Sequence, residues 1–185
     1  MSALILALAQ KCASIPTKGA IMGKYDEYVI HPPLMHMTVN EDGRQVFHGF
    51  MANKGLHGCK FTMGYQIVTK PFIGDNPAHR HNFQEFLAWY GTNPDDPFEF
   101  DAEVEFYMGE EQERFLITQP TLVSLPPGLI HSPLNILRVG KPIVQLEVML
   151  PPMDGSDPTR EFVMPEDRGI DPYSRVTLEY TPQPE

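Results

Sequence analysis

Proline constrains the fold of this chain more than any other residue type. Nineteen of the 185 residues are proline, and they are spread along the whole sequence. Proline lacks a backbone N–H and fixes one backbone angle, so it interrupts helices and central strands. Long helices are therefore not expected beyond the first twenty or so residues.

Short alternating segments, separated by Gly, Pro, Asn or Asp, fill most of the chain. Residues 61–67 and 102–108 alternate between apolar and mostly polar side chains. Further strand candidates are residues 114–118, 121–125, 135–139 and 143–150. Many short strands at this spacing predict an all-β sandwich or barrel.

The length suits one well-packed domain and is short for two. We expect this domain over residues 21–150, preceded by a short helix within residues 1–20. Leu4, Ile5 and Leu8 would share one face of that helix. The apolar run over residues 3–9 also resembles the hydrophobic part of a secretory signal peptide. No positively charged residue precedes this run, so the helix is the favoured interpretation. The run is too short to span a bilayer, which takes about 20 residues.

The tail over residues 151–185 differs in composition from the rest. It holds seven of the nineteen prolines and few large apolar residues. We expect an extended arm that lies on the surface or on a neighbouring subunit, with one edge strand over residues 175–180.

Charge and cysteine content narrow the partners and the compartment. The formal net charge is −10 and the pI about 5.1, so the surface repels phosphate backbones and anionic lipid. Nucleic acid and membranes are therefore not expected as partners. Cys12 and Cys59 are interpreted as free thiols of a cytoplasmic protein, although a single disulfide remains an alternative.

Two histidines stand one residue apart in "GDNPAHRHNFQEFLAWYG". On a strand, His79 and His81 share a face, roughly 6–7 Å apart at the backbone. Glu85 has the same parity but would lie roughly 20 Å from His79 on a straight strand. A turn through residues 82–84 would return Glu85 to the two imidazoles. A helix would pair His81 with Glu85 but direct His79 elsewhere, so strand–turn–strand is the interpretation that unites all three.

A fourth ligand candidate follows the tight turn Pro126-Pro127-Gly128 in "PPGLIHSPLN". His131 comes three residues after Gly128. Three neutral imidazoles and one carboxylate form a ligand set suited to Fe(II), Mn(II), Ni(II), Co(II), Cu(II) or Zn(II).

These two stretches resemble the two motifs of the cupin family. The first motif, G-x5-H-x-H-x3,4-E-x6-G, is matched by Gly74, His79, His81, Glu85 and Gly91, with the first and last gaps each one residue shorter. The resemblance covers residues 65–150, with a long connection that we interpret as an insertion after Gly91.

The second cupin motif, G-x5-P-x-G-x2-H-x3-N, is matched by Pro126, Gly128, His131 and Asn135 at its own spacing. Its leading glycine is replaced by Pro120. The resemblance implies a jelly-roll β-barrel in which His79, His81, Glu85 and His131 bind one divalent transition metal, with iron favoured.

Other residues receive more ordinary interpretations. Asn82, Gln84 and Asn135 are interpreted as turn residues, with a supporting role behind the ligands as the alternative. His31, His36, His48 and His57 are interpreted as surface or pocket-lining residues, with a second metal site as the alternative. Aromatic residues on strands usually belong to the core, and this prediction covers Tyr65, Phe83, Phe86, Trp89 and Phe106.

The strand over residues 143–150 has one fully apolar face, formed by Val144, Leu146, Val148 and Leu150. We expect that face in the core. Gln145 and Glu147, on the other face, would then lie outside, on an interface or at the barrel mouth.

Three functions fit the resemblance. The favoured one is an Fe(II)-type dioxygenase that acts on a small organic molecule. The alternatives are a non-redox metal-dependent isomerase, lyase or decarboxylase, and a non-catalytic metal- or ligand-binding module. Because cupins commonly pair through their sheets, the resemblance also implies a homodimer.

Overall fold

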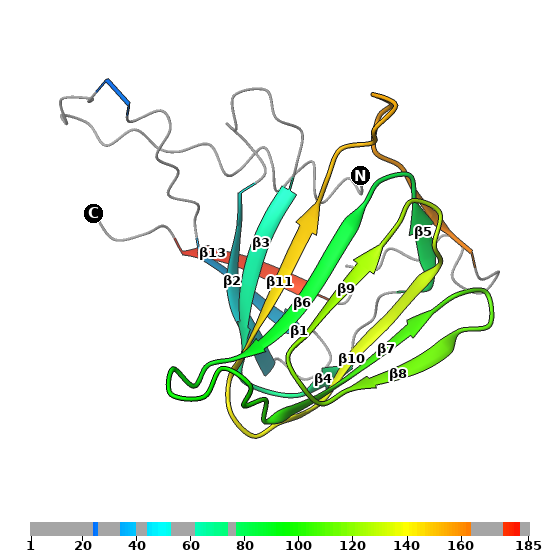
Figure 1. The fold of residues 1–185 in the computed structure, drawn as a ribbon. Helices are drawn as coiled ribbons and strands as arrows, with labels where there is room; N and C mark the ends of the chain where they lie inside the picture. Colours follow the sequence, from blue (N-terminus) through cyan, green and yellow to red (C-terminus); the bar gives the residue numbers. More distant parts are fainter. Residues whose placement is uncertain are drawn as a thin grey trace.

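The computed structural model describes residues 24–25, 34–39, 44–52, 62–73, 77–163 and 176–181 (Figure 1). This part of the chain contains strands and no helix. In chain order the strands are β1 (Leu34–Val39), β2 (Arg44–Ala52), β3 (Thr62–Val68), β4 (Phe72–Ile73), β5 (His79–His81), β6 (Glu85–Gly91), β7 (Ala102–Met108), β8 (Glu113–Ile117), β9 (Thr121–Leu125), β10 (His131–Val139), β11 (Ile143–Met149), β12 (Arg160–Phe162) and β13 (Val176–Thr181).

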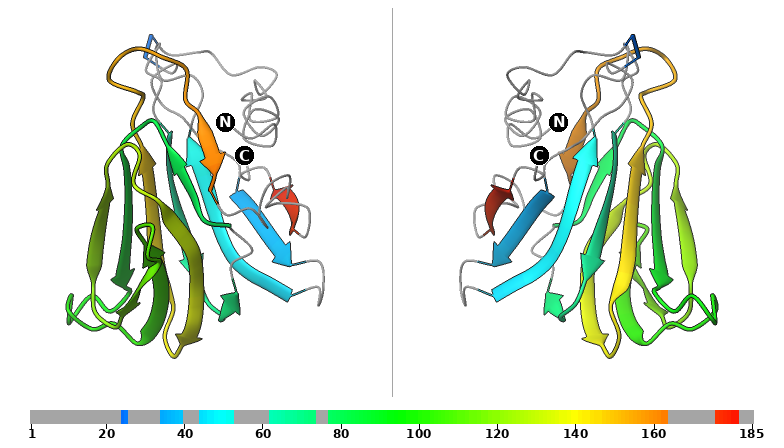
Figure 2. Two further views of the ribbon diagram at one scale, coloured as in Figure 1. Left: turned by 90° about the vertical axis from the view of Figure 1, so that its right-hand side faces the viewer. Right: turned by 90° about the vertical axis from the view of Figure 1, so that its left-hand side faces the viewer.

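The strands form two antiparallel sheets, which Figure 2 shows from two opposite sides. The seven-stranded sheet has the order β13-β1-β2-β3-β11-β6-β9. The six-stranded sheet has the order β12-β5-β10-β7-β8, and β4 pairs with β10. Several neighbours, such as β13 and β1, β3 and β11, and β5 and β12, are far apart in sequence, and the described chain changes sheet repeatedly. This is the all-β jelly-roll arrangement that the cupin motifs imply.

The hydrophobic core lies between the two sheets. Trp89 and Ile143 contribute from the seven-stranded sheet, and Val104, Phe106 and Ile136 contribute from the six-stranded sheet, all fully buried. Alternate residues of a strand point to opposite faces, so each of these strands presents every second side chain to the core.

The strand positions predicted from alternation are confirmed. Residues 102–108 and 121–125 form β7 and β9 without any shift, and residues 114–118 form β8 one residue earlier. Strand β10 begins four residues before the predicted start, at His131 itself. The apolar pattern did not reveal this extension because the first residues of β10 are polar or proline.

The prediction for the inner face of β11 is wrong. Glu85, which lies inside, is the register partner of Met149, and opposite residues in an antiparallel pair share a face. The inner face of β11 therefore carries Ile143, Gln145, Glu147 and Met149, while Val144, Leu146 and Val148 face outward. The same register shows that the prediction of Phe86 and Tyr65 as core residues is wrong. Both lie on that outer face and are only partly buried. Trp89, Phe106 and Phe83 are buried as expected.

The insertion expected after Gly91 connects the two sheets as a loop over residues 92–101. The loop folds back so closely that a Cβ on Gly91 would lie 1.9 Å from the carbonyl oxygen of Glu99. Only glycine fits that approach.

The C-terminal arm contributes to both sheets. Strand β13 pairs with β1 at the edge of the seven-stranded sheet. It is the edge strand predicted over residues 175–180, shifted by one residue toward the C-terminus. Strand β12, which was not predicted, pairs with β5. The predicted N-terminal helix, Cys12 and Cys59 lie outside the described residues.

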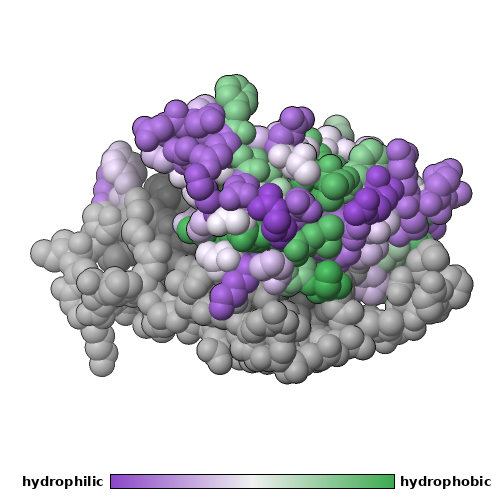
Figure 3. All heavy atoms as spheres, turned by 90° about the horizontal axis from the view of Figure 1, so that it is seen from below, coloured by the Kyte–Doolittle hydropathy of each residue, from purple (hydrophilic) through white to green (hydrophobic). Residues whose placement is uncertain are grey.

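Residues 95 to 113 form an acidic run that holds nine Asp or Glu residues and no Lys or Arg, and several of its carboxylates are paired with basic side chains from outside the run. Among its carboxylates, Glu99 pairs with Lys141, Asp101 with Arg138, and Glu105 with Arg114. Seen from below, the described surface mixes hydrophilic and hydrophobic side chains (Figure 3). No helix in the described part of the chain is long and apolar enough to cross a bilayer.

Candidate metal centre

Strand β5 carries the first two ligand candidates. His79 and His81 are buried and Arg80 between them is exposed, as the alternation of a strand requires. Arg80 instead pairs on the outer side with Glu161 of β12, at 2.9 Å. Both imidazoles therefore point into the space between the sheets.

The turn over residues 82–84 carries the chain from one sheet to the other. It leads from β5, in the six-stranded sheet, to Glu85 at the start of β6, in the seven-stranded sheet. The strand–turn–strand arrangement is present, with one refinement. Glu85 approaches the imidazoles from the opposing sheet rather than from a neighbouring strand.

The turn Pro126-Pro127-Gly128 brings His131 to the same place. Gly128 has a φ of +84°, where a side chain would be strained, and its N–H donates to the carbonyl of His81 at 2.8 Å. His131 then opens β10 as the register partner of His79. A bulge follows immediately, with Ser132 at a φ of +78°. The two motifs are thus joined by backbone hydrogen bonding as well as by their side chains.

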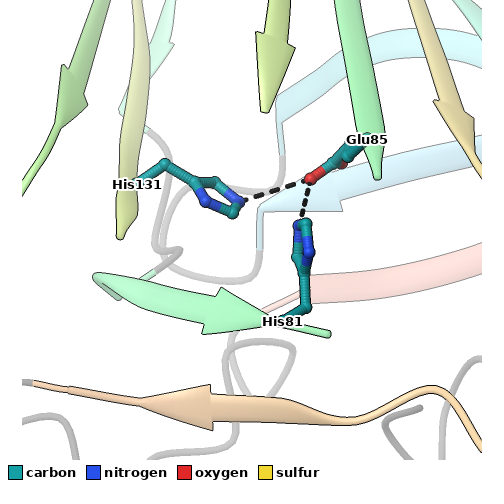
Figure 4. A group of neighbouring side chains, drawn as sticks. All are labelled: His81, Glu85 and His131. Atoms are coloured by element: carbon teal, nitrogen blue, oxygen red, sulfur yellow. Dashed lines mark hydrogen bonds and ion pairs between the residues drawn. The ribbon is translucent and has the colours of Figure 1, made fainter. Parts of the chain in front are cut away.

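Three buried side chains converge on one point (Figure 4). Their ligand atoms, from His81, Glu85 and His131, all lie within 4.8 Å of one another. His81 Nε2 lies 2.8 Å from Glu85 Oε2. His131 Nε2 lies 3.3 Å from the same oxygen. The His131 contact has the distance of an ion pair but not the alignment of a hydrogen bond, so this buried nitrogen has no hydrogen-bond partner among the described residues.

All three histidines turn the same nitrogen toward the backbone. His79 Nδ1 donates to Pro77 O at 2.8 Å, and His81 Nδ1 donates to Phe83 O at 2.8 Å. His131 Nδ1 donates to Leu129 O at 2.9 Å. A carbonyl oxygen only accepts, so each Nδ1 must carry a proton. Each Nε2 is thereby left as the nitrogen that faces the interior, which is the usual way proteins orient a metal-binding imidazole.

The surroundings of His81 call for a cation. Its Nδ1 meets a carbonyl oxygen and its Nε2 meets a carboxylate oxygen, and both are acceptors. A neutral imidazole can donate from only one nitrogen. A divalent metal between His81, Glu85 and His131 would resolve this conflict and occupy the orphaned His131 Nε2. Two ligands on one ion are at most roughly 4.2 Å apart, so the three would have to close only slightly.

His79 lies beside this group rather than within it. Its ring is 4.4 Å from that of His131 and 6.1 Å from that of His81, measured between centroids. Burial lowers the pKa of His79 to about 3, and the charges of Arg160 and His131 act in the same direction. His79 is therefore neutral at pH 7, as a metal ligand must be.

Two carboxyl groups, those of Glu85 and Glu147, face the site, and their pKa values are shifted in opposite directions. Burial alone would raise the pKa of Glu85, but the close approach of the His131 and His81 imidazoles to its carboxylate outweighs burial and holds that pKa below its usual range. Burial raises the pKa of Glu147 to about 8, and the adjacent charge of Glu85 adds to the shift. The pair can thus hold one negative charge and one proton at neutral pH.

Aromatic rings enclose the histidines. Phe83 stacks on His81 with 4.0 Å between centroids and an interplanar angle of 4°. Phe162 meets His79 edge-on at 6.1 Å, and Phe106 lies 6.2 Å from His131. These contacts restrict the rotamers of the imidazoles and lower the local dielectric, which strengthens electrostatic interactions within the site.

The polar residues of the two motifs support the loops. Asn82 donates to Ser156 Oγ and Asp157 O and accepts from Thr159 N, so it anchors the loop before β12. Gln84 donates to Ser124 Oγ on β9. Asn135 donates to Glu105 Oε2 at 2.8 Å. The turn interpretation fits Asn82 and Gln84, whereas Asn135 ties β10 to β7.

The sequence pattern does not place Glu147 and Arg160 beside the site. Because the other face of β11 is fully apolar, the pattern predicts Glu147 outside the barrel, on an interface or at the barrel mouth. Arg160 lies in the proline-rich arm, where composition gave no sign of a strand. The cross-strand register of β12 with β5 was the missing information. His36 and His48 are register partners on β1 and β2, and the side chains of all four remaining histidines lie outside the described part.

Comparisons with known proteins give distant structural matches only. No protein-family model and no curated protein matches the chain. A structure of FeII HppE is 15% identical, with a TM-score of 0.41, covering 72% of this chain and 62% of that one. A structure of an oxalate decarboxylase from B. subtilis is 14% identical, with a TM-score of 0.39, covering 64% and 30%. A structure of the DMSP lyases RdDddP and RnDddQII is 14% identical, with a TM-score of 0.37, covering 61% and 51%.

The assignment of the fold rests on the chain's own residues. Two antiparallel sheets enclose a core, and both motifs meet inside it with three ligand-type side chains converging. The described part of this chain therefore has the two-sheet jelly-roll fold that the resemblance to the cupin motifs implies, and the residues of both motifs meet inside it.

Proposed function

We propose that the protein is a metal-dependent enzyme that acts on a small organic molecule, with the metal held by His79, His81, Glu85 and His131. The observation that carries the proposal is the convergence of three buried ligand atoms, one of them orphaned. Burial of this many polar groups costs stability, and a bound cation would compensate for that cost. His79 would complete the set by a small movement of its neutral ring.

Within this proposal the favoured activity is that of an Fe(II)-type dioxygenase. A bound metal would supply an open coordination position for a substrate donor atom and for O2. The chain itself would orient the ligands through the three backbone carbonyls, and its aromatic rings would exclude water. A small-molecule substrate fits an enclosed site between two sheets.

A non-redox isomerase, lyase or decarboxylase is the second candidate. The inward-facing carboxyl group of Glu147, next to Glu85, favours it, because such reactions need a group that exchanges protons with the substrate. Manganese, nickel, cobalt, copper or zinc could then replace iron.

Metal content and oxygen dependence discriminate between these candidates. Protein purified without added metal, under anaerobic conditions, should contain iron in one equivalent per chain and consume O2 with substrate. Zinc or manganese, with turnover that is unchanged by removing O2, would exclude the dioxygenase and favour the non-redox enzyme. Full metal content with no turnover across a metabolite panel would favour a binding module.

We further propose a cytoplasmic homodimer. The outer face of the seven-stranded sheet exposes apolar side chains of neighbouring strands, including Ile67, Tyr90 and Leu122. A second copy packed on this face would cover them. Light scattering should give twice the chain mass, and Leu122→Lys should shift it to that of a monomer. A monomeric mass for the unmodified chain would refute the dimer. Cell fractionation tests the cytoplasmic location.

A further inference from the structure

Arg160 is placed beside the metal centre by strand pairing. Its register partner on β5 is His81, and Phe162 is the partner of His79. Opposite residues of an antiparallel pair share a face, so Arg160 and Phe162 point inward with the two histidines. The edge-on contact between Phe162 and His79 agrees with this orientation.

The guanidinium group of Arg160 contains a buried atom without a partner. Among the buried side-chain nitrogen and oxygen atoms of the described residues, two lack a hydrogen-bond partner: His131 Nε2 and Arg160 Nη1. An unsatisfied buried donor is costly, and more so when it is charged. The first of these atoms faces the metal position. The second lies on the strand next to it.

The charge of Arg160 affects the pKa values of residues on both sides of the site. It lowers the pKa of His79 in the six-stranded sheet and opposes the rise in the pKa of Glu147 in the seven-stranded sheet. The guanidinium group is therefore within electrostatic reach of residues that flank the metal position from both sheets.

The loop before β12 is fixed to the metal-binding turn. Asn82 makes three hydrogen bonds with Ser156, Asp157 and Thr159. Because Asn82 directly follows His81, these bonds set the position of Arg160 relative to the ligands. Arg160 is thus part of a built site, not of a free tail.

We infer that Arg160 binds the carboxylate of the substrate, which is a small organic acid whose second donor atom binds the metal. This inference rests on the proposed metal-dependent function. A guanidinium group presents a planar fork of donors that matches a carboxylate, and the pairing gains strength in an enclosed site. The metal would occupy the orphaned His131 Nε2 and the carboxylate of the acid would accept from the orphaned Arg160 Nη1, so that Arg160 selects anions over neutral molecules.

The test compares lactate with its neutral analogue lactamide by calorimetry. The full-length protein is titrated in metal-free and in Co(II)-loaded form. Lactate should bind both forms, and more tightly the cobalt form, while lactamide should bind at least about tenfold more weakly. Arg160→Gln should lose at least about tenfold in lactate affinity in both forms, and Arg160→Lys should lose less because it keeps the charge but not the fork.

Arg80→Gln is the matched control. Arg80 lies on the adjacent strand in the same sheet, but on its outer face, and this variant should bind lactate as the unmodified protein does. Retained cobalt binding shows that a variant is folded. If Arg160→Gln does not fold, Arg160→Lys and the comparison of lactate with lactamide decide.

Equal lactate affinity in Arg160→Gln and the unmodified protein would overturn the inference, as would equal binding of lactate and lactamide or no lactate binding at millimolar concentration. Failure of the proposed function looks different. In that case cobalt would not bind, while metal-free protein would still bind lactate in a manner that depends on Arg160.

Discussion

The two ends of the space between the sheets are built from the same strands and differ in character. Along β6, Glu85 at one end is followed on the inner face by Leu87 and Trp89. Along β10, His131 is followed by Leu134 and Ile136. One end therefore concentrates polar groups and the other is an apolar core. Because polar burial costs stability and apolar burial supplies it, we expect function and stability to be separable along each strand.

The largest effect is expected from removing a ligand at the polar end. His81→Ala should weaken metal binding by more than about 100-fold, because outer partners of ligands alone are worth 10–100-fold. Equilibrium dialysis with Co(II) measures this. The midpoint temperature of thermal unfolding of the metal-free variant should be close to that of the metal-free unmodified protein. Retention of full metal occupancy by His81→Ala would show that the metal site is assigned to the wrong residues.

The apolar end should give the reverse result. Ile136→Ala removes a fully buried side chain and should destabilise the fold by about 2–5 kcal/mol in urea unfolding. The variant should still bind one equivalent of metal under native conditions. If metal affinity fell as steeply as in His81→Ala, the two ends would be coupled and the separation would fail.

A smaller effect is expected where the two ends meet. Trp89 Nε1 donates to Gln145 Oε1 at 3.0 Å, and both side chains are buried. Gln145→Leu leaves the indole N–H unpaired and should cost about 1–3 kcal/mol. Adding Trp89→Phe removes that N–H, so the double variant should lose less stability than the two single changes added together. Additive losses would mean that the hydrogen bond contributes little.

The smallest effect concerns pH and lies away from both ends. Hydrogen bonds from Asn135 and Arg114 hold the pKa of Glu105 below its usual range of about 4.5. A depressed carboxyl pKa contributes stability above the unfolded value, and that stability is lost as the pH falls through the folded value. Glu105→Gln should therefore lower stability at pH 7 by less than about 1 kcal/mol and flatten the decline below about pH 4.5.

Urea unfolding across this pH range checks the prediction, with Glu113→Gln as a control for the loss of a charge. Glu113 lies on the neighbouring strand with an exposed side chain. A variant of Glu105 with the same acid sensitivity as the unmodified protein would show that another carboxylate controls the decline.

The parts of the fold that follow from local pattern could be predicted. Alternation and turn residues located β3, β7, β8, β9, β11, β13 and most of β10, but not β1, β2, β4 or β12. The spacing of His79, His81, Glu85 and His131 placed them near one site. The sequence did not reveal which sheet each strand joins. Glu85 arrives from the opposing sheet, and β12 reaches β5 across about eighty residues, because long-range pairing leaves no local signal.

The inward face of β11 could not be predicted for a different reason. Hydrophobicity favoured Val144, Leu146 and Val148 as core residues, and by that criterion alone the assignment was sound. The strand instead follows the register imposed by Met149 opposite Glu85. A metal site demands polar groups inside, and an apolar outer face is left over. Places where the pattern fails in this way mark function.

The three carbonyl groups that accept from the imidazoles have a consequence for how such a centre can change. Pro77, Phe83 and Leu129 contribute only their backbone oxygens to this role, so the course of the backbone determines which imidazole nitrogen faces the metal. Exchanging one side chain for another at these positions leaves the three hydrogen bonds in place. An insertion or deletion beside any of the three histidines would break the hydrogen bond of that histidine. We expect the length of these short segments to tolerate far less variation than their composition.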